Sequence, residues 1–291
     1  MEKMLLASLI LASALACGGD ESSAAGEIQV VVSIPPQVYF VSRIGGDRVR
    51  VSAILPPGAS PAVYEPGPAD MRMIAEADLY LAIGVPFEDA WLPRLESANP
   101  DLPVVATQQG IQRRHIQRHG TEAHDSHDHD GAPDPHIWLS PQLVRAQAET
   151  IARALIERDP GGESLYRANL ESFQREIEGL QARLQEVLES SSAEAFVVFH
   201  PSWGYLADEL GLVQLPIEVA GQEPSAAELA ELVEYARQLE VPVVLVAPQF
   251  SRRTAETVAQ EIGARVELAD PLASDWPENL LEVTRKIAES R

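Results

Sequence analysis

The pattern of apolar and polar positions predicts an alternation of strands and helices in two parts of the chain. Apolar, β-branched runs predict strands at 28–34, 49–55, 79–83 and 103–106, with helices at 70–77 and 143–156. A second series is predicted with strands at 195–199, 213–217, 241–247 and 264–268 and helices at 204–210, 225–239, 252–262 and 277–290. Because strands alternate with helices in both series, we expect α/β structure with largely parallel sheets.

One stripe of mostly apolar residues predicts a long helix between the two series, over residues 163–189. Its members recur at steps of three or four residues: Leu165, Asn169, Phe173, Ile177, Leu180, Leu184 and Leu188. At about 1.5 Å per residue this helix would reach roughly 40 Å, the length of a two-lobed molecule. We therefore expect an N-terminal lobe at 27–162, a linking helix at 163–190 and a C-terminal lobe at 191–291. Each lobe should hold a mainly parallel sheet flanked by helices, and a small ligand should bind in the cleft between them.

The first 26 residues have the pattern of an exported protein. Residues 4–16 form an apolar run that is too short for a transmembrane helix and suits a signal peptide, which we place at 1–16. The run ends in Ala-Leu-Ala-Cys17-Gly, which resembles the lipobox of bacterial lipoproteins, where the cysteine is lipidated. The alternative is an ordinary secretory peptide. In both cases we expect a periplasmic or cell-surface protein, and with lipidation Cys17 would anchor it to the membrane through a polar tether at 17–26.

Composition narrows the class of ligand. The net charge is −22, with 44 acidic and 22 basic residues, which argues against binding to nucleic acid. Cys17 is the only cysteine, so the chain has neither an internal disulfide nor a thiolate zinc site.

A polar, histidine-rich stretch at 111–132 interrupts the first series and predicts a loop. It contains five of the seven histidines: His115, His119, His124, His127 and His129. Aspartates alternate with the last three, and imidazole with carboxylate is a suitable ligand set for divalent transition metals. The loop could therefore capture metal weakly at several positions, or it could be a solvated insertion without a ligand.

The other two histidines and one aspartate have positions that suit a single site. His200 and Asp270 each follow a predicted strand, and His136 precedes a predicted helix. Side chains at the carboxyl ends of parallel strands face the crevice of an open α/β sheet. Two imidazoles and a carboxylate there would make a metal shell, although each residue taken singly could serve a structural role.

A series of short motifs runs along nearly the whole chain: Gly45-Gly46-Asp47, Pro56-Pro57-Gly58, Tyr64-Glu65-Pro66, Ala77-Asp78-Leu79, Asp134-Pro135-His136-Ile137-Trp138, Phe199-His200-Pro201-Ser202-Trp203, Glu223-Pro224-Ser225 and Ala269-Asp270-Pro271-Leu272. In this order the motifs resemble those of the zinc/manganese-type ABC-transporter solute-binding proteins. The resemblance implies two α/β lobes joined by one long rigid backbone helix. It also implies a monomeric, non-enzymatic protein that delivers a divalent metal to an ABC permease and its ATPase.

The resemblance implies metal ligands at His136, His200 and Asp270, but the first ligand of the family is missing. The family has a histidine two residues before the tyrosine of Tyr64-Glu65-Pro66, and here that position is Ala62. A loop histidine or Glu65 could replace it, a water could complete the shell, or the site could be degenerate. In the last case the protein could be a surface adhesin, and a metallohydrolase is a third class.

The imidazole-rich ligand set favours Zn²⁺ over Mn²⁺, which prefers carboxylate-rich shells. Cu²⁺ and Ni²⁺ are also compatible with this set.

Overall fold

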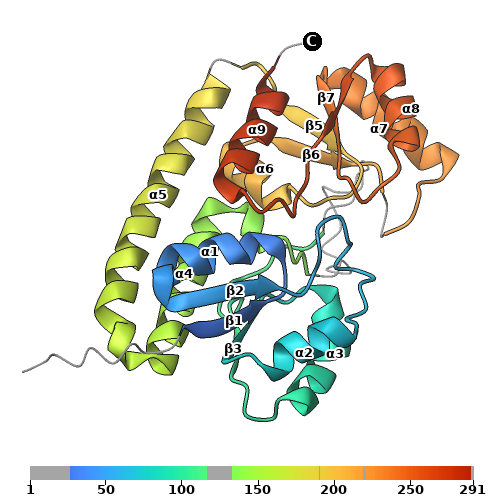
Figure 1. The fold of residues 1–291 in the computed structure, drawn as a ribbon. Helices are drawn as coiled ribbons and strands as arrows, with labels where there is room; N and C mark the ends of the chain where they lie inside the picture. The colour runs from blue at the N-terminus through green and yellow to red at the C-terminus, as the bar shows by residue number, and fades with distance from the viewer. Residues whose placement is uncertain (1–26, 117–132, 190, 219–220, 290–291) are drawn as a thin grey trace, which may run out of the picture.

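The computed structural model describes residues 27–116, 133–189, 191–218 and 221–289, which form two four-stranded, fully parallel sheets (Figure 1). The first sheet has the order β2-β1-β3-β4 and the second β6-β5-β7-β8. Their strands are β1 (Ile28–Val32), β2 (Val49–Ala53), β3 (Leu79–Ala82), β4 (Val104–Ala106), β5 (Ala195–Val198), β6 (Val213–Pro216), β7 (Val243–Val246) and β8 (Arg265–Leu268). The predicted α/β fold with parallel sheets is confirmed. In the second sheet the order reverses between β5 and β7, so a crevice is expected at the carboxyl ends of these two strands.

Helices connect the strands, and two of them were not predicted from the sequence. The helices besides the linking helix are α1 (Pro35–Gly45), α2 (Pro68–Ala75), α3 (Pro86–Ala98), α4 (Pro141–Arg158), α6 (Gly204–Leu210), α7 (Ala226–Gln238), α8 (Arg252–Ile262) and α9 (Trp276–Ala288). The unpredicted helices, α1 and α3, both begin at a proline. Proline ends a strand, but its fixed φ also suits the first turn of a helix. At the start of α1 the Gln37 side-chain oxygen accepts hydrogen bonds from the backbone N–H groups of Ser33 and Ile34.

The predicted long helix is confirmed as α5 (Glu163–Glu189), which runs along both lobes (Figure 1). It packs against α1 and α4 of the first lobe and against α6 and α9 of the second. The buried stripe differs from the predicted one at its first turn, because Tyr166 is fully buried there while Leu165 is 41% exposed. Tyr166 is held in this position by a hydrogen bond from its hydroxyl to Asp159.

Asp159 joins α4 to α5 and to the first lobe. Its carboxylate accepts hydrogen bonds from Tyr166 and from Arg48 Nε, both at 2.7 Å. Burial by itself would raise the pKa of Asp159, but the hydrogen bonds from Tyr166 and Arg48 outweigh it, and the pKa is lowered. The charged carboxylate therefore stabilises the start of α5.

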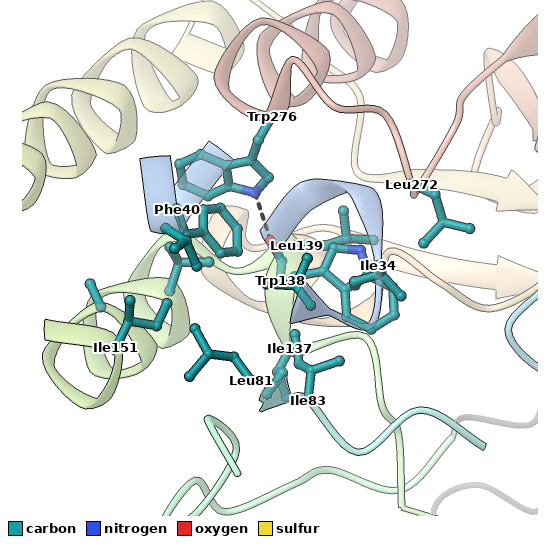
Figure 2. Close-up of a cluster of buried hydrophobic side chains, with 14 of the residues drawn as sticks. Ile34, Phe40, Leu81, Ile83, Ile137, Trp138, Leu139, Ile151, Leu272 and Trp276 are labelled. Atoms are coloured by element: carbon teal, nitrogen blue, oxygen red, sulfur yellow. Dashed lines mark hydrogen bonds between the residues drawn. The ribbon is translucent and has the colours of Figure 1, made fainter. Parts of the chain in front are cut away.

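Two tryptophans link the lobes through hydrogen bonds, of which Figure 2 shows the one between Trp276 and Trp138. The Trp276 indole N–H donates to the carbonyl of Trp138 at 2.6 Å, and the Trp138 indole N–H donates to the carbonyl of Pro271 at 2.6 Å. The Trp276 ring also meets Phe40 edge-on, with centroids 5.1 Å apart. One apolar core runs from the first lobe through α4, α5 and α9 to the second sheet, and a separate cluster lies under α7 and α8. The shared core makes the two lobes one packed body.

The signal peptide at 1–16, Cys17 and the tether at 17–26 lie outside the described residues. In the four ranges that the structure describes, no helix is long and apolar enough to cross a membrane. The lobe boundaries at residues 162 and 191 stay predictions.

Candidate metal centre

His200 lies two residues after β5, at the carboxyl end of the strand where the order of the second sheet reverses. The backbone N–H groups of Ile217 and Glu218 donate to the carbonyls of Val198 and Phe199, which extends the pairing of β5 with β6. This register sets the Glu218 carboxylate beside the imidazole, with 2.5 Å between His200 Nδ1 and Glu218 Oε2. One face of the imidazole ring stacks on the Phe250 ring, with the two centroids 5.3 Å apart. The hydrogen bond to Glu218 sets the direction of Nδ1, and the stacking on Phe250 sets the tilt of the imidazole ring.

His136 is fixed by its own chain segment. The Asp134 Oδ1 atom accepts a hydrogen bond from the His136 backbone N–H at 3.0 Å and lies 2.7 Å from His136 Nδ1. His136 is 6% exposed and Asp134 is 1% exposed. Burial lowers the pKa of His136, with a smaller effect in the same direction from His200, while Asp134 acts in the opposite direction. The ring is therefore neutral near pH 7, and only the neutral form can bind a metal.

The two imidazoles meet at the junction of the lobes. Their centroids are 5.3 Å apart, with an angle of 72° between the ring planes. Because Nδ1 of each ring faces a carboxylate, the proton of the neutral ring belongs on Nδ1 and the lone pair on Nε2. No residue in the described part of the chain forms a hydrogen bond with either Nε2 atom. Both nitrogens are thus available as metal donors.

Asp270 follows β8 and is also held in place. Its Oδ1 atom accepts hydrogen bonds from Gln249 Nε2 at 3.3 Å and from the backbone N–H of Leu272 at 3.0 Å. The bond from Trp138 to Pro271 ties this segment to the one that carries His136. Nevertheless, the described residues contain no group of three or more histidine, cysteine, aspartate or glutamate side chains close enough to hold a metal. The structure brings His136 and His200 together, and Asp270 as third ligand stays a prediction.

The Asp134 carboxylate also lies near the guanidinium of Arg114, which follows β4 in the first lobe. Arg114 Nε lies 3.8 Å from Asp134 Oδ2, and Arg114 Nη1 bonds Asp208 of α6 at 2.7 Å. The Tyr205 hydroxyl donates to the Asp134 carbonyl at 2.9 Å and accepts from the Arg114 backbone N–H. Burial, followed by the charge of Asp134, raises the pKa of Tyr205 to about 12, so this hydroxyl keeps its proton. These contacts connect the His136 segment to both lobes.

A family model described as "Zinc-uptake complex component A periplasmic" matches residues 30–290. The chain belongs to this ZnuA family. The high-affinity zinc uptake system protein ZnuA of Bacillus subtilis is 31% identical over 272 residues, which cover 88% of this chain and 84% of that protein. A crystal structure of ZnuA matches with a TM-score of 0.83 and 44% identity, over 91% of this chain and 99% of that one.

One further structure bears on the alternative of adhesion. The laminin-binding protein Lmb of Streptococcus agalactiae is described as bifunctional, with adhesin and metal-transporting activity. It matches with a TM-score of 0.77 and 25% identity, over 90% of this chain and all of that one.

In this ZnuA-family chain Ala62, the position of the missing first-lobe ligand, lies in an exposed turn. Ala62 and Glu65 are both exposed, and the Ala62 backbone N–H donates to the Ser60 hydroxyl. The neighbouring motif residues have a structural role, because the Tyr64 hydroxyl and the Gly67 backbone N–H both donate to Asp70 at the start of α2. Glu65 as a substitute ligand stays a prediction.

Of the predicted loop ligands, only His115 lies in the described part of the chain. It forms a backbone bridge with Pro133 across the ends of the segment 117–132. His119, His124, His127 and His129 lie outside the described residues, so their contact with metal stays a prediction.

The two carboxylates that orient the imidazoles, Asp134 and Glu218, were not predicted from the sequence. Asp134 had a local signal, since it lies two residues before His136. Glu218 had none, because it approaches His200 only through the parallel register of β5 and β6.

Proposed function

We propose that this protein is the extracytoplasmic solute-binding component of a metal ABC importer, with Zn²⁺ as its cargo. The observation that carries the proposal is the pair His136 and His200. Two buried or half-buried imidazoles meet between the lobes, and each has Nδ1 against a carboxylate and Nε2 without a protein partner among the described residues. A metal-binding histidine usually has its second nitrogen bonded in this way.

Zinc fits this donor set better than manganese. Two neutral imidazole nitrogens with one carboxylate oxygen make a three-ligand set for a tetrahedral ion, whereas manganese favours oxygen-rich shells. The family model and the Bacillus subtilis relative are both named for zinc uptake, which supports the same metal. The protein would pass the ion to an ABC permease and its ATPase, and the role is that of a carrier, without a chemical reaction.

Release of the ion would need only small movements of the lobes. The crossed bonds of Trp138 and Trp276, the shared core and the packing of α5 on both lobes all oppose wide opening. We infer that contact with the permease loosens the site locally. We also infer a monomer held at the membrane by lipid on Cys17.

The missing first-lobe ligand can be tested by restoring it. Ala62→Val and Ala62→His change the same exposed turn, but only histidine adds a donor. If the turn lies within reach of the ion, Ala62→His should tighten zinc binding and Ala62→Val should leave it unchanged. Equal affinities in both variants would mean that the turn does not reach the ion. A loop histidine or a bound water would then complete the shell.

The proposal is tested by metal competition titration of the purified protein with zinc, manganese, copper and nickel. We expect one tight zinc site that is lost in His136→Ala and in His200→Ala. His115→Ala tests the one loop histidine that lies in the described part of the chain: loss of the site in this variant would make His115 the substitute ligand. A variant without residues 120–131 separates the loop from the cleft. If it retains only weak sites, a loop histidine completes the shell; if the intact protein shows only weak sites that vanish with the loop, the importer proposal is wrong.

A further inference from the structure

We propose that Gln249 is a positioning residue that restricts Asp270 to one metal-binding oxygen and thereby selects zinc over manganese. This inference rests on the proposed function and concerns a residue outside the predicted ligand set.

The geometry of Asp270 leaves one of its oxygens for an ion. Oδ1 accepts two hydrogen bonds, from Gln249 Nε2 at 3.3 Å and from the Leu272 backbone N–H at 3.0 Å. The Asp270 carbonyl accepts a third bond, from Asn279 at 2.8 Å, which fixes the backbone of the same residue. Oδ2 forms no hydrogen bond with any residue in the described ranges. An Asp270 held in this way binds a metal through Oδ2 alone.

Gln249 makes this contact at a cost. Its amide must direct Nε2 toward Asp270, since the opposite orientation would set its oxygen against a carboxylate oxygen. In this orientation Gln249 Oε1 is buried and has no hydrogen-bond partner in the described part of the chain. A buried polar atom left unpaired is unfavourable, so such groups in native structures call for an explanation. Here the explanation is the hydrogen bond from Gln249 Nε2 to Asp270, a candidate metal ligand.

The position of Gln249 joins two candidate ligands. It follows β7, next to β5 in the second sheet, at the carboxyl edge where the strand order reverses. Phe250, the next residue, stacks on the ring of His200 with a centroid distance of 5.3 Å and an interplanar angle of 25°. Two consecutive residues therefore hold the imidazole of one ligand and the carboxylate of another.

This arrangement bears on metal choice through coordination number. Zinc is satisfied by four single-atom donors, whereas manganese favours more oxygen ligands and gains from a bidentate carboxylate. When Gln249 occupies Oδ1, Asp270 cannot chelate the ion. Removal of the amide donor frees Oδ1 in part and lets the carboxylate turn toward bidentate binding.

The test compares Gln249→Leu with Gln108→Leu in the purified protein. Gln108 is the matched control, because its Oε1 is also buried without a described partner, but it lies after β4 and bonds none of the candidate ligands. Zinc and manganese affinities are measured by competition with a chelator. Visible absorption of the cobalt-loaded protein reports geometry, since four-coordinate cobalt absorbs much more strongly than six-coordinate cobalt.

We expect Gln249→Leu to lower zinc affinity by roughly ten- to hundredfold, as for other groups that orient metal ligands. Manganese affinity should stay constant or rise, and the cobalt absorption should weaken. Gln108→Leu should match the unaltered protein in all three measurements. An unchanged zinc-to-manganese preference together with an unchanged cobalt spectrum in Gln249→Leu would overturn the inference.

Two further outcomes are separable from these. If the unaltered protein binds neither zinc nor cobalt, the proposed function fails, and the inference fails with it. If Gln249→Leu does not fold, X-ray absorption of the zinc-loaded, unaltered protein decides. A four-coordinate zinc supports a single Asp270 oxygen, and a bidentate carboxylate overturns it.

Discussion

Trp276→Phe should destabilise the whole protein, because the indole of Trp276 lies in the core that the two lobes share. Trp276 is 1% exposed, and its ring meets those of Phe40 and Phe173 with centroids 5.1 and 6.4 Å away. Phenylalanine retains these aromatic contacts in part but has no N–H to donate. The carbonyl of Trp138 then loses the donor that reaches it at 2.6 Å.

The magnitude follows from two contributions. An unpaired buried carbonyl costs about 1–3 kcal/mol. The smaller ring gives up roughly 40 Å² of buried apolar surface, which at about 25 cal/mol per Å² is about 1 kcal/mol. We therefore expect a loss of about 2–4 kcal/mol, a large share of the roughly 5–15 kcal/mol by which a typical domain is stable.

Urea unfolding of the metal-free protein, followed by far-ultraviolet circular dichroism, measures this loss without relying on tryptophan fluorescence. Trp91→Phe is the matched control, since Trp91 is only half-buried on α3 and its ring lies under Arg94. It should cost less than about 1 kcal/mol. Equal losses in the two variants would refute the view that Trp276 joins the lobes.

Three other substitutions test single contacts. Gly84→Ala should cost about 1–3 kcal/mol more of unfolding free energy than Gly110→Ala. Both glycines have a positive φ, 80° and 82°, so the backbone penalty is shared, but only at Gly84 would the added Cβ displace the Arg113 guanidinium and its two hydrogen bonds. Equal melting-temperature shifts would contradict this. Asp159→Asn should destabilise the protein at pH 7 and flatten the acid side of its stability profile. The lowered folded-state pKa of Asp159 gives stability that is present above the ordinary value of 3.8 and is lost as pH falls through the folded value. A difference in unfolding free energy between variant and unaltered protein that stays constant down to acid pH in urea titrations would count against this. Ser225→Ala should cost about 1 kcal/mol in urea unfolding, because Ser225 and Glu228 cap α7 reciprocally, and no change would show that the cap is not needed.

The sequence by itself determined the class of fold. β-Branched runs located the strands, their alternation with helices predicted parallel sheets, and the stripe of α5 predicted its bounds, because these signals depend on which side chains are buried along one element. The two helices that begin at prolines were missed, since proline both ends strands and begins helices. Tyr166, and not Leu165, is buried in the stripe because its hydroxyl donates a hydrogen bond to Asp159.

Only the tertiary structure determined which side chains orient the candidate metal ligands. His136, His200 and Asp270 were predicted from their places next to strands and helices and from the resemblance to a family, and the lost first-lobe ligand is visible as Ala62 in the sequence. Glu218 and Gln249 carried no sequence signal. Glu218 meets His200 through the register of β5 and β6, and Gln249 meets Asp270 because β7 and β8 end side by side. Local patterns fix which residues form an element, but only the pairing of distant strands fixes which side chains orient a ligand.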